Sequence, residues 1–204
     1  MLAAFRGNRE VVEVLLGWGA NLNHHQSGQL CKMTTESNLL EPLIGVMPTP
    51  LGCGIAGGKL GVVEILLSAG ADVREKIQGR TALHEACRIT GTTVCRKLLE
   101  KGAEVDSCCR EGTPLMFALL CKQHETVRLL LERGANPNHN MKIPTSLSHE
   151  TPLDVAMWVA NRSTRALIAQ DLSVIELLLE HGAFLDNSSA KALTKLRKRA
   201  AITP

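Results

Sequence analysis

Apolar residues in this chain gather in short leucine-rich clusters, each followed within a few residues by a Gly-Ala pair. A segment such as Val62-Val63-Glu64-Ile65-Leu66-Leu67 predicts a short helix. The glycine after it suits the left-handed conformation that closes helices. The pattern therefore predicts a series of similar helices, and their closing glycines are Gly19, Gly70, Gly102, Gly134 and Gly182.

A second motif, Thr-Pro-Leu or a near match, precedes four of these clusters, at residues 49–51, 81–83, 113–115 and 151–153. Threonine is a good N-cap because its hydroxyl accepts a hydrogen bond from an unpaired N–H of the first helical turn. Proline fits the first helical position, where its missing N–H costs nothing. The motif predicts a first short helix in each unit, with a small residue where neighbouring helices approach closely: Ala86, Ala118 and Ala156.

The distance between the two motifs shows that the units are true repeats. The threonine and the glycine are 21 residues apart in three consecutive units, from 49 to 70, from 81 to 102 and from 113 to 134. In the unit from 151 to 182 the distance is 31, so that unit carries ten extra residues. A helix pair of this size cannot bury its own apolar face, so the units are expected to stack.

The segment Thr81-Ala82-Leu83-His84-Glu85-Ala86 resembles the T-P-L-H-x-A signature of the ankyrin repeat family. The resemblance covers about residues 1–186 and implies an all-α solenoid of stacked helix–turn–helix units with hairpin-like connections. In that family the histidine helps to tie neighbouring repeats together. The other units carry a different residue at its position, which implies weaker or irregular coupling: Gly52, Met116 and Asp154.

The expected organisation is a repeat domain over residues 1–186 with repeats at 1–23, 49–74, 79–107, 111–139 and 150–186, and a tail at 187–204. The first repeat lacks Thr-Pro-Leu and starts inside its first helix, as in a truncated isoform, a gene fragment or a degenerate natural cap. Three insertions lengthen the regular repeat pattern: residues 24–48, six residues around 141–144, and ten residues from Asn161 to Gln170. Each is either a tolerated surface insertion without function or a loop on the binding face.

The tail spaces Leu193, Leu196 and Ala200 as one face of an amphipathic helix. We interpret it as a capping helix with a basic outer face. A nuclear-import signal is the alternative reading of its basic run from Lys195 to Arg199.

Composition narrows the function classes. With 45% apolar and 21% charged residues the chain is not disordered, and with three Phe, two Trp and no Tyr its core must be aliphatic. The net charge is +3, but residues 187–204 hold five positive charges and no acid, which leaves about −2 on the rest of the chain. This balance does not indicate nucleic acid as a partner. No apolar stretch approaches the ~20 residues that span a bilayer, so no membrane is expected.

No residue pattern indicates an enzyme, a cofactor or a metal site. The seven cysteines lack C-x-x-C spacing, which favours reduced thiols in the cytoplasm, with the nucleus as the alternative. Cys87, Cys95 and Cys121 fit small hydrophobic positions. The glycines of 52–54 and 57–58 favour close packing over a nucleotide cradle. His24-His25 with Cys31 lack the paired spacing of metal ligands.

The resemblance implies that the connecting turns and the exposed side of each first helix line a concave groove for a partner protein. Carried over position by position, the candidate partner-binding residues are Phe5, Arg6, Gln78, Arg80, Arg88, Ile89, Arg110, Leu120, Cys121, Trp158 and Val159.

Trp158 stands out in this set because binding hot spots are enriched in tryptophan and arginine. It either contacts a partner or packs under the ten-residue insertion. Arg80, Arg88 and Arg110 either form a basic strip for an acidic peptide or only keep the surface soluble.

We therefore predict a monomeric scaffold that binds a partner protein. Replacing Trp158 and Arg88 together with alanine is expected to abolish that binding. The alternatives are a ligand- or metal-dependent activity in residues 24–48 and a regulatory ankyrin portion of a larger protein.

Overall fold

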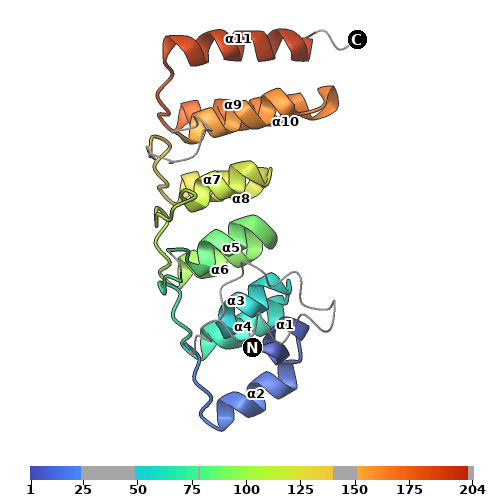
Figure 1. Ribbon diagram of the computed structural model, residues 1–204, viewed down its shortest axis with the longest axis vertical. Helices are drawn as coiled ribbons and strands as arrows, with labels where there is room; N and C mark the ends of the chain where they lie inside the picture. The colour runs from blue at the N-terminus through green and yellow to red at the C-terminus, as the bar shows by residue number, and fades with distance from the viewer. Residues whose placement is uncertain (24–48, 78, 140–150, 202–204) are drawn as a thin grey trace. The chain divides into compact units, whose positions relative to one another are not determined.

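The computed structural model describes residues 1–23, 49–77, 79–139 and 151–201 (Figure 1). Every regular element in these ranges is an α helix, so the expected all-α fold is confirmed. Two isolated β-bridges in the same ranges, Ile77 with Arg80 and Cys109 with Gly112, close hairpin-like connections between repeats. The expectations for residues 24–48, for Gln78 and for the segment around 141–144 lie outside the described residues.

The chain divides into two compact units, Met1–Glu104 and Val105–Pro204. The first unit contains six helices in its described residues: α1 Leu2–Arg6, α2 Arg9–Gly17, α3 Pro50–Ala56, α4 Leu60–Ser68, α5 Ala82–Ile89 and α6 Thr92–Glu100. The second contains five: α7 Pro114–Leu120, α8 His124–Glu132, α9 Pro152–Arg162, α10 Arg165–Glu180 and α11 Asn187–Ala201.

Within each unit the helix pairs stack side by side, as Figure 1 shows. In the N-terminal unit α1, α3 and α5 form one row and α2, α4 and α6 form the other. In the C-terminal unit α7 packs on α9, α8 packs on α10, and α11 lies against both α9 and α10. Stacking thus gives each pair a buried apolar face that it does not have alone.

Threonine caps the first helix of three repeats as predicted. Thr49 Oγ1 accepts a hydrogen bond from the N–H of Gly52 at 3.0 Å, and Thr151 Oγ1 accepts one from the N–H of Asp154 at 3.2 Å. In the third case His84 Nδ1 lies 3.0 Å from the backbone N of Thr81 and 2.9 Å from its hydroxyl. These bonds satisfy backbone N–H groups that a helix start otherwise leaves unpaired.

The fourth threonine, Thr113, shows what the loss of the histidine changes. Its Oγ1 is buried and has no hydrogen-bond partner among the described residues. The residue at the position of His84 is Met116, which is 1% exposed and has no polar hydrogen to share. A buried hydroxyl without a partner lowers stability.

We therefore expect Met116→His to raise the free energy of unfolding by about 1 kcal/mol, because the imidazole gives the Thr113 hydroxyl a partner. Urea denaturation followed by far-UV circular dichroism measures the change. Met116→Leu, which supplies no polar atom, is the control and is expected to bring no gain. Equal stability of the two variants would contradict the assignment.

The Gly-Ala pair closes the second helix of each repeat in one way. At the end of α6, Gly102 has φ +86° and its N–H donates to the carbonyl of Leu99, while the N–H of Ala103 donates to the carbonyl of Leu98. This is the Schellman arrangement, in which a left-handed residue pairs the last carbonyls. The alanine is buried at four of the five turns and exposed at Ala20; the buried ones are Ala71, Ala103, Ala135 and Ala183.

A polar contact between neighbouring turns couples the repeats within each unit, and the sequence pattern did not predict it. The residue four positions after the glycine reaches the turn of the next repeat. Asn23 accepts from the N–H of Asp72, and Arg74 donates to the carbonyl of Gly102. In the C-terminal unit Asp106 accepts from the N–H of Asn136, and Asn138 bonds both Gly182 and Phe184. Coupling thus persists where the family histidine is absent.

The ten extra residues of the fifth repeat were expected to lie between its two helices as an insertion, and this was wrong in part. They mainly lengthen the helices: α9 has 11 residues and α10 has 16, against 7 to 9 in the helices from α2 to α8. Only Ser163 and Thr164 separate α9 from α10.

The tail forms the expected amphipathic helix, α11. Its apolar residues Leu193 and Leu196 are buried, and its lysines and its Arg197 are exposed. Asp186 precedes the helix and accepts a hydrogen bond from the N–H of Ser189. Hydrogen bonds from Ser189 and Ser188 hold the pKa of the Asp186 carboxyl below its usual value.

Candidate partner-binding surface

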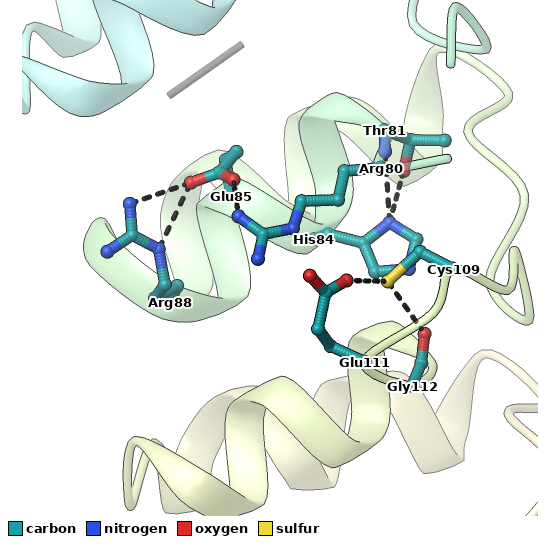
Figure 2. A network of polar contacts seen from close by, with 8 residues as sticks. All are labelled: Arg80, Thr81, His84, Glu85, Arg88, Cys109, Glu111 and Gly112. Carbon is teal, nitrogen blue, oxygen red and sulfur yellow. Dashed lines mark hydrogen bonds and ion pairs between the residues drawn. The ribbon is translucent and has the colours of Figure 1, made fainter. Parts of the chain in front are cut away.

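A buried carboxylate organises the arginines of the third repeat. Glu85 lies on α5 with a fully buried side chain, and Arg80 Nη1 is 3.3 Å from its Oε1 (Figure 2). Arg88, one turn further along α5, donates from Nε and Nη2 to Oε2 at 3.1 and 2.9 Å. Such charge-assisted, two-pronged bonds fix the direction of a guanidinium group.

This network changes the expected basic strip. Arg80 and Arg88 share one negative charge, so they do not present two full positive charges to a partner. Arg80 is half-buried, while Arg88 keeps 38% of its side chain exposed. Arg110 is exposed and lies in the C-terminal unit. Within the N-terminal unit, therefore, Arg80 and Arg88 do not act as two independent positive groups.

The remaining candidates of the N-terminal unit differ in accessibility. Arg6, the last residue of α1, is exposed, whereas Phe5 and Ile89 are half-buried. The carbonyl of Phe5 lies so near Gly57 that a Cβ on that glycine would be 2.2 Å from the carbonyl oxygen. This contact between α1 and α3 confirms that Gly57 serves close packing.

In the C-terminal unit the two neighbouring positions at the end of α7 are open to solvent. Leu120 is 47% exposed, and Cys121 is exposed as well. Cys121, which was expected to fit a small hydrophobic position and also to lie on the binding surface, is exposed because α7 ends at the residue before it. For Cys87 and Cys95 the same interpretation is confirmed: both are buried, with their sulfur atoms 3.7 Å apart.

Val159 was expected on the binding surface and instead belongs to the core. Its side chain is 6% exposed. Val159 follows Trp158 on α9, and one step along a helix points the next side chain in a different direction, here into the interior of the unit. A side chain with so little exposure does not contact a partner unless the fold opens.

Trp158 is half-buried at the edge of a cavity of about 380 Å³. The cavity lies between α9 and α11, and Met157 and Leu196 contribute apolar surface to it. Trp158 thus lines a hollow closed on one side by the terminal helix, and it remains accessible. The residues that line the cavity are Asp154, Met157, Trp158, Asn161, Ser188, Ser189, Ala192, Lys195 and Leu196.

Basic groups surround this cavity. The guanidinium carbon of Arg162 is 4.8 Å from the centre of the Trp158 ring, a cation–π distance. Lys195 lines the cavity, and Arg199 donates to the backbone and side-chain oxygens of Asn161 at 3.1 Å. The acidic lining residue, Asp154, already accepts hydrogen bonds from the N–H and hydroxyl of Thr151. Around the Trp158 ring, the basic side chains of Arg162, Lys195 and Arg199 therefore outnumber the one acidic lining residue, Asp154.

A second polar cluster, which the sequence did not reveal, anchors the long fifth repeat to the fourth. Asp171 of α10 is buried; its Oδ1 lies 3.3 Å from His124 Nε2 and its Oδ2 lies 3.7 Å from Lys122 Nζ. Lys122 also donates to the hydroxyl of Ser163. Its φ of +54° is unusual for a residue other than glycine. These contacts hold the C-terminal ends of α7 and α9 and the start of α8 against the middle of α10.

Among residues 1–23, 49–77, 79–139 and 151–201, no three His, Cys, Asp or Glu side chains are arranged to hold a metal ion. Burial raises the pKa of the Cys53 thiol to about 11, which keeps it protonated and unreactive. Cys109 donates to Glu111 and to the carbonyl of Gly112 (Figure 2), and burial followed by the Glu111 contact raises its pKa.

No helix in the described ranges has both the length and the apolar character needed to cross a membrane.

Comparison with known proteins places the repeats in a family. Residues 49–141 match the family description "Ankyrin repeats (3 copies)", and residues 1–26 match "Ankyrin repeat". The two matches together cover more than half of the chain.

Relatives support the same assignment. The chain is 36% identical over 108 residues to human "Ankyrin repeat and SOCS box protein 16", a match that covers 52% of this chain and 23% of that protein. It is 28% identical over 179 residues to "Ankyrin repeat and KH domain-containing protein mask-1" of Caenorhabditis elegans, covering 84% of this chain and 6% of the relative. It is 37% identical over 93 residues to the Oryctolagus cuniculus protein "Ankyrin repeat, SAM and basic leucine zipper domain-containing protein 1", covering 45% and 17%. The chain thus spans less than a quarter of each of these relatives, and with both its helix-pair architecture and its sequence matches it belongs to the ankyrin repeat family.

Proposed function

We propose that this chain is a non-enzymatic interaction scaffold that binds a partner protein through the C-terminal unit. Ankyrin repeats generally act as protein–protein interaction modules. The observation that carries the finer proposal is the accessible Trp158 ring beside the 380 Å³ cavity between α9 and α11. We call the binding surface formed by Leu120, Trp158, Arg162 and Lys195 the Trp158 surface.

Leu120 and Trp158 occupy the same position in successive repeats, on the neighbouring helices α7 and α9. Leu120 is 47% exposed and Trp158 is half-buried, so both supply apolar area that a partner is able to cover. Tryptophan is frequent among hot spots because it buries a large area with little loss of conformational freedom.

The charges suggest what the partner segment contains. Arg162 over the Trp158 ring and Lys195 in the cavity wall favour carboxylates near the apolar contacts. An extended or helical peptide with an apolar anchor and flanking acidic residues matches this combination. Because the surface lies on helices that are already packed, binding involves little ordering of the scaffold.

The double variant Trp158→Ala with Arg88→Ala is not the best test of this surface. Arg88 is bound to the buried Glu85 in the other unit, so its removal affects stability as well as binding. Leu120→Ala with Trp158→Ala keeps the change within the Trp158 surface.

To test the proposal, peptides that bind the intact chain are selected from a displayed library. Fluorescence polarisation then measures the affinity of each selected peptide for the wild type and for the variants. Binding to Leu120→Ala/Trp158→Ala is expected to be roughly 30-fold weaker or more, which corresponds to the loss of at least one hot spot. Phe184→Ala, which removes an aromatic residue that is 77% exposed elsewhere in the unit, serves as the control. If selected peptides are not acidic, or bind the double variant as well as wild type, the proposal is overturned.

The relatives suggest the setting in which such a surface works. Each carries ankyrin repeats together with another named region, a SOCS box, a KH domain, or SAM and basic leucine zipper domains. A second candidate role is therefore that of the partner-selecting portion of a larger protein. The six cysteines of the described ranges are thiols, which supports a cytoplasmic or nuclear location.

A further inference from the structure

Two cysteines face each other in the core of the third repeat. Cys87 lies on α5 and Cys95 lies on α6, and both residues are 0% exposed. Their sulfur atoms are 3.7 Å apart, which is van der Waals contact, so no other atom lies between them. The helices α5 and α6 pack on each other, and only Thr90 and Gly91 separate them in the chain. One helix pair therefore holds two thiols in contact.

Neighbouring repeats place aliphatic side chains at these two positions. The equivalent pairs, counted back from the closing glycine, are Ile55 with Val63 in the second repeat and Leu119 with Val127 in the fourth. All four of these residues are at most 4% exposed, so the positions belong to the core in each repeat. Aliphatic residues satisfy the packing at such positions, whereas a facing pair of thiols adds the capacity to form a covalent bond.

We propose that Cys87 and Cys95 form a reversible oxidation site, at which hydrogen peroxide converts the two thiols into a disulfide bond that locks α5 to α6. One thiol attacks a peroxide oxygen and the O–O bond breaks, which gives a sulfenic acid and one water. The other thiol attacks the sulfenic sulfur, and a sulfur–sulfur bond replaces the S–OH bond as a second water leaves. The two cysteines together lose two electrons, and one peroxide gains them.

The reverse reaction needs a small reducing thiol such as glutathione. Two molecules of it reduce the disulfide in turn and leave as their own disulfide, and Cys87 and Cys95 regain their protons. The site is therefore a thiol pair in a reducing compartment and a crosslink under sustained oxidation.

Burial determines when this site reacts. In the closed helix pair both thiols are covered, so oxidation proceeds from states in which α6 moves away from α5. Gly91 joins the two helices with φ +73°, a left-handed conformation that glycine adopts without strain. Once the bond has formed, it disfavours the open state, because a crosslink removes conformations from the opened chain.

Mass spectrometry of the intact, folded chain after peroxide treatment tests the proposal. Once the peroxide is removed, the remaining thiols are alkylated in urea. Trypsin then separates the two cysteines, because it cleaves after Arg80, Arg88 and Arg96. The expected product is peptide 81–88 joined to peptide 89–96, with two hydrogens fewer than the reduced peptides. It is expected to be roughly 10-fold or more abundant than after oxidation of the chain in urea, where the contact is lost.

Hydrogen exchange measures what the bond does to the repeat. Amide exchange in α5 and α6 of the oxidised chain is expected to be roughly 30-fold or more slower than in the reduced chain, because the crosslink opposes local opening. Treatment with a reducing agent is expected to restore the original rate. Both helices lie in the N-terminal unit, so the result does not depend on the peptide-binding surface proposed for the other unit.

Cys95→Val is the matched variant, because valine occupies the equivalent position at Val63 and Val127. It is expected to keep the circular dichroism of the wild type and to show neither linked peptides nor slower exchange after peroxide. Cys121→Ser removes an exposed thiol from the other unit and is expected to give the same linked peptides as wild type.

Three results would overturn the proposal. The first is recovery of the two peptides unlinked from the folded wild type at a peroxide dose that oxidises the exposed Cys121. The second is a linkage of Cys87 or Cys95 that prefers other cysteines, or that forms as readily in urea. The third is a linked chain whose α5 and α6 exchange as fast as in the reduced chain.

Discussion

Replacing Glu85 with alanine is expected to destabilise the N-terminal unit by about 3 kcal/mol, at the lower end of the cost of breaking a buried ion pair. The carboxylate is fully buried and holds Arg80 and Arg88, which are 23% and 38% exposed. The variant leaves two guanidinium groups beside a cavity in α5. Their partial access to water keeps the cost from rising further. Urea denaturation followed by circular dichroism measures the loss, and hydrogen exchange locates it in α5 and its neighbours.

A matched pair of variants separates charge from volume at this site. Glu85→Gln keeps the shape and loses the charge, so it is expected to lie between wild type and Glu85→Ala. Adding Arg88→Ala to Glu85→Ala is expected to cost less than Arg88→Ala does alone, because the two residues act on the same interaction. A loss below about 0.5 kcal/mol for Glu85→Ala would show that the network contributes nothing beyond an ordinary surface contact.

The second large effect is expected from Gly57→Ala. A methyl group there would lie 2.2 Å from the carbonyl oxygen of Phe5, and backbone on both sides prevents either atom from moving freely. Overpacking of this kind costs about 3 kcal/mol, and the loss falls on the contact between α1 and α3. Faster hydrogen exchange in α1 and α2, with α5 and α6 little changed, is the expected signature.

Gly17→Ala is the matched control for this variant. Gly17 is the last residue of α2, and a Cβ added there meets no atom within 4 Å. The same chemical change is therefore expected to be neutral or to stabilise the helix by up to about 1 kcal/mol. If both glycine variants behaved alike, the close approach of α1 and α3 would not be the cause.

The repeat architecture was readable from the sequence because its signals are local. The Thr-Pro-Leu starts and Gly-Ala ends predicted helix boundaries that the structure confirms, since capping and left-handed closure depend on residues within one turn. The glycine at 57 was correctly read as a close contact, although its partner in α1 was not foreseeable.

The details of the candidate binding surface were harder to predict from the sequence. A position carried over from the family placed Val159 outside, whereas the lengthened α9 buries it. The expected strip of arginines did not anticipate Glu85, because the burial of a carboxylate between Arg80 and Arg88 is a property of the folded unit. The anchor formed by Lys122, Ser163 and Asp171 joins residues up to 49 positions apart and has no signature in any short segment.

The sequence by itself determined that this protein is a stack of helix pairs, where the first helix of four repeats begins and the second helix of each repeat ends, and that the core is aliphatic. The tertiary structure alone decided which candidate binding residues are exposed and which charged side chains pair with one another. The physical reason is the separation along the chain between the residues that interact. Helix caps and turns are fixed by neighbours in the chain, whereas burial and charge pairing depend on which helices are brought together across many residues.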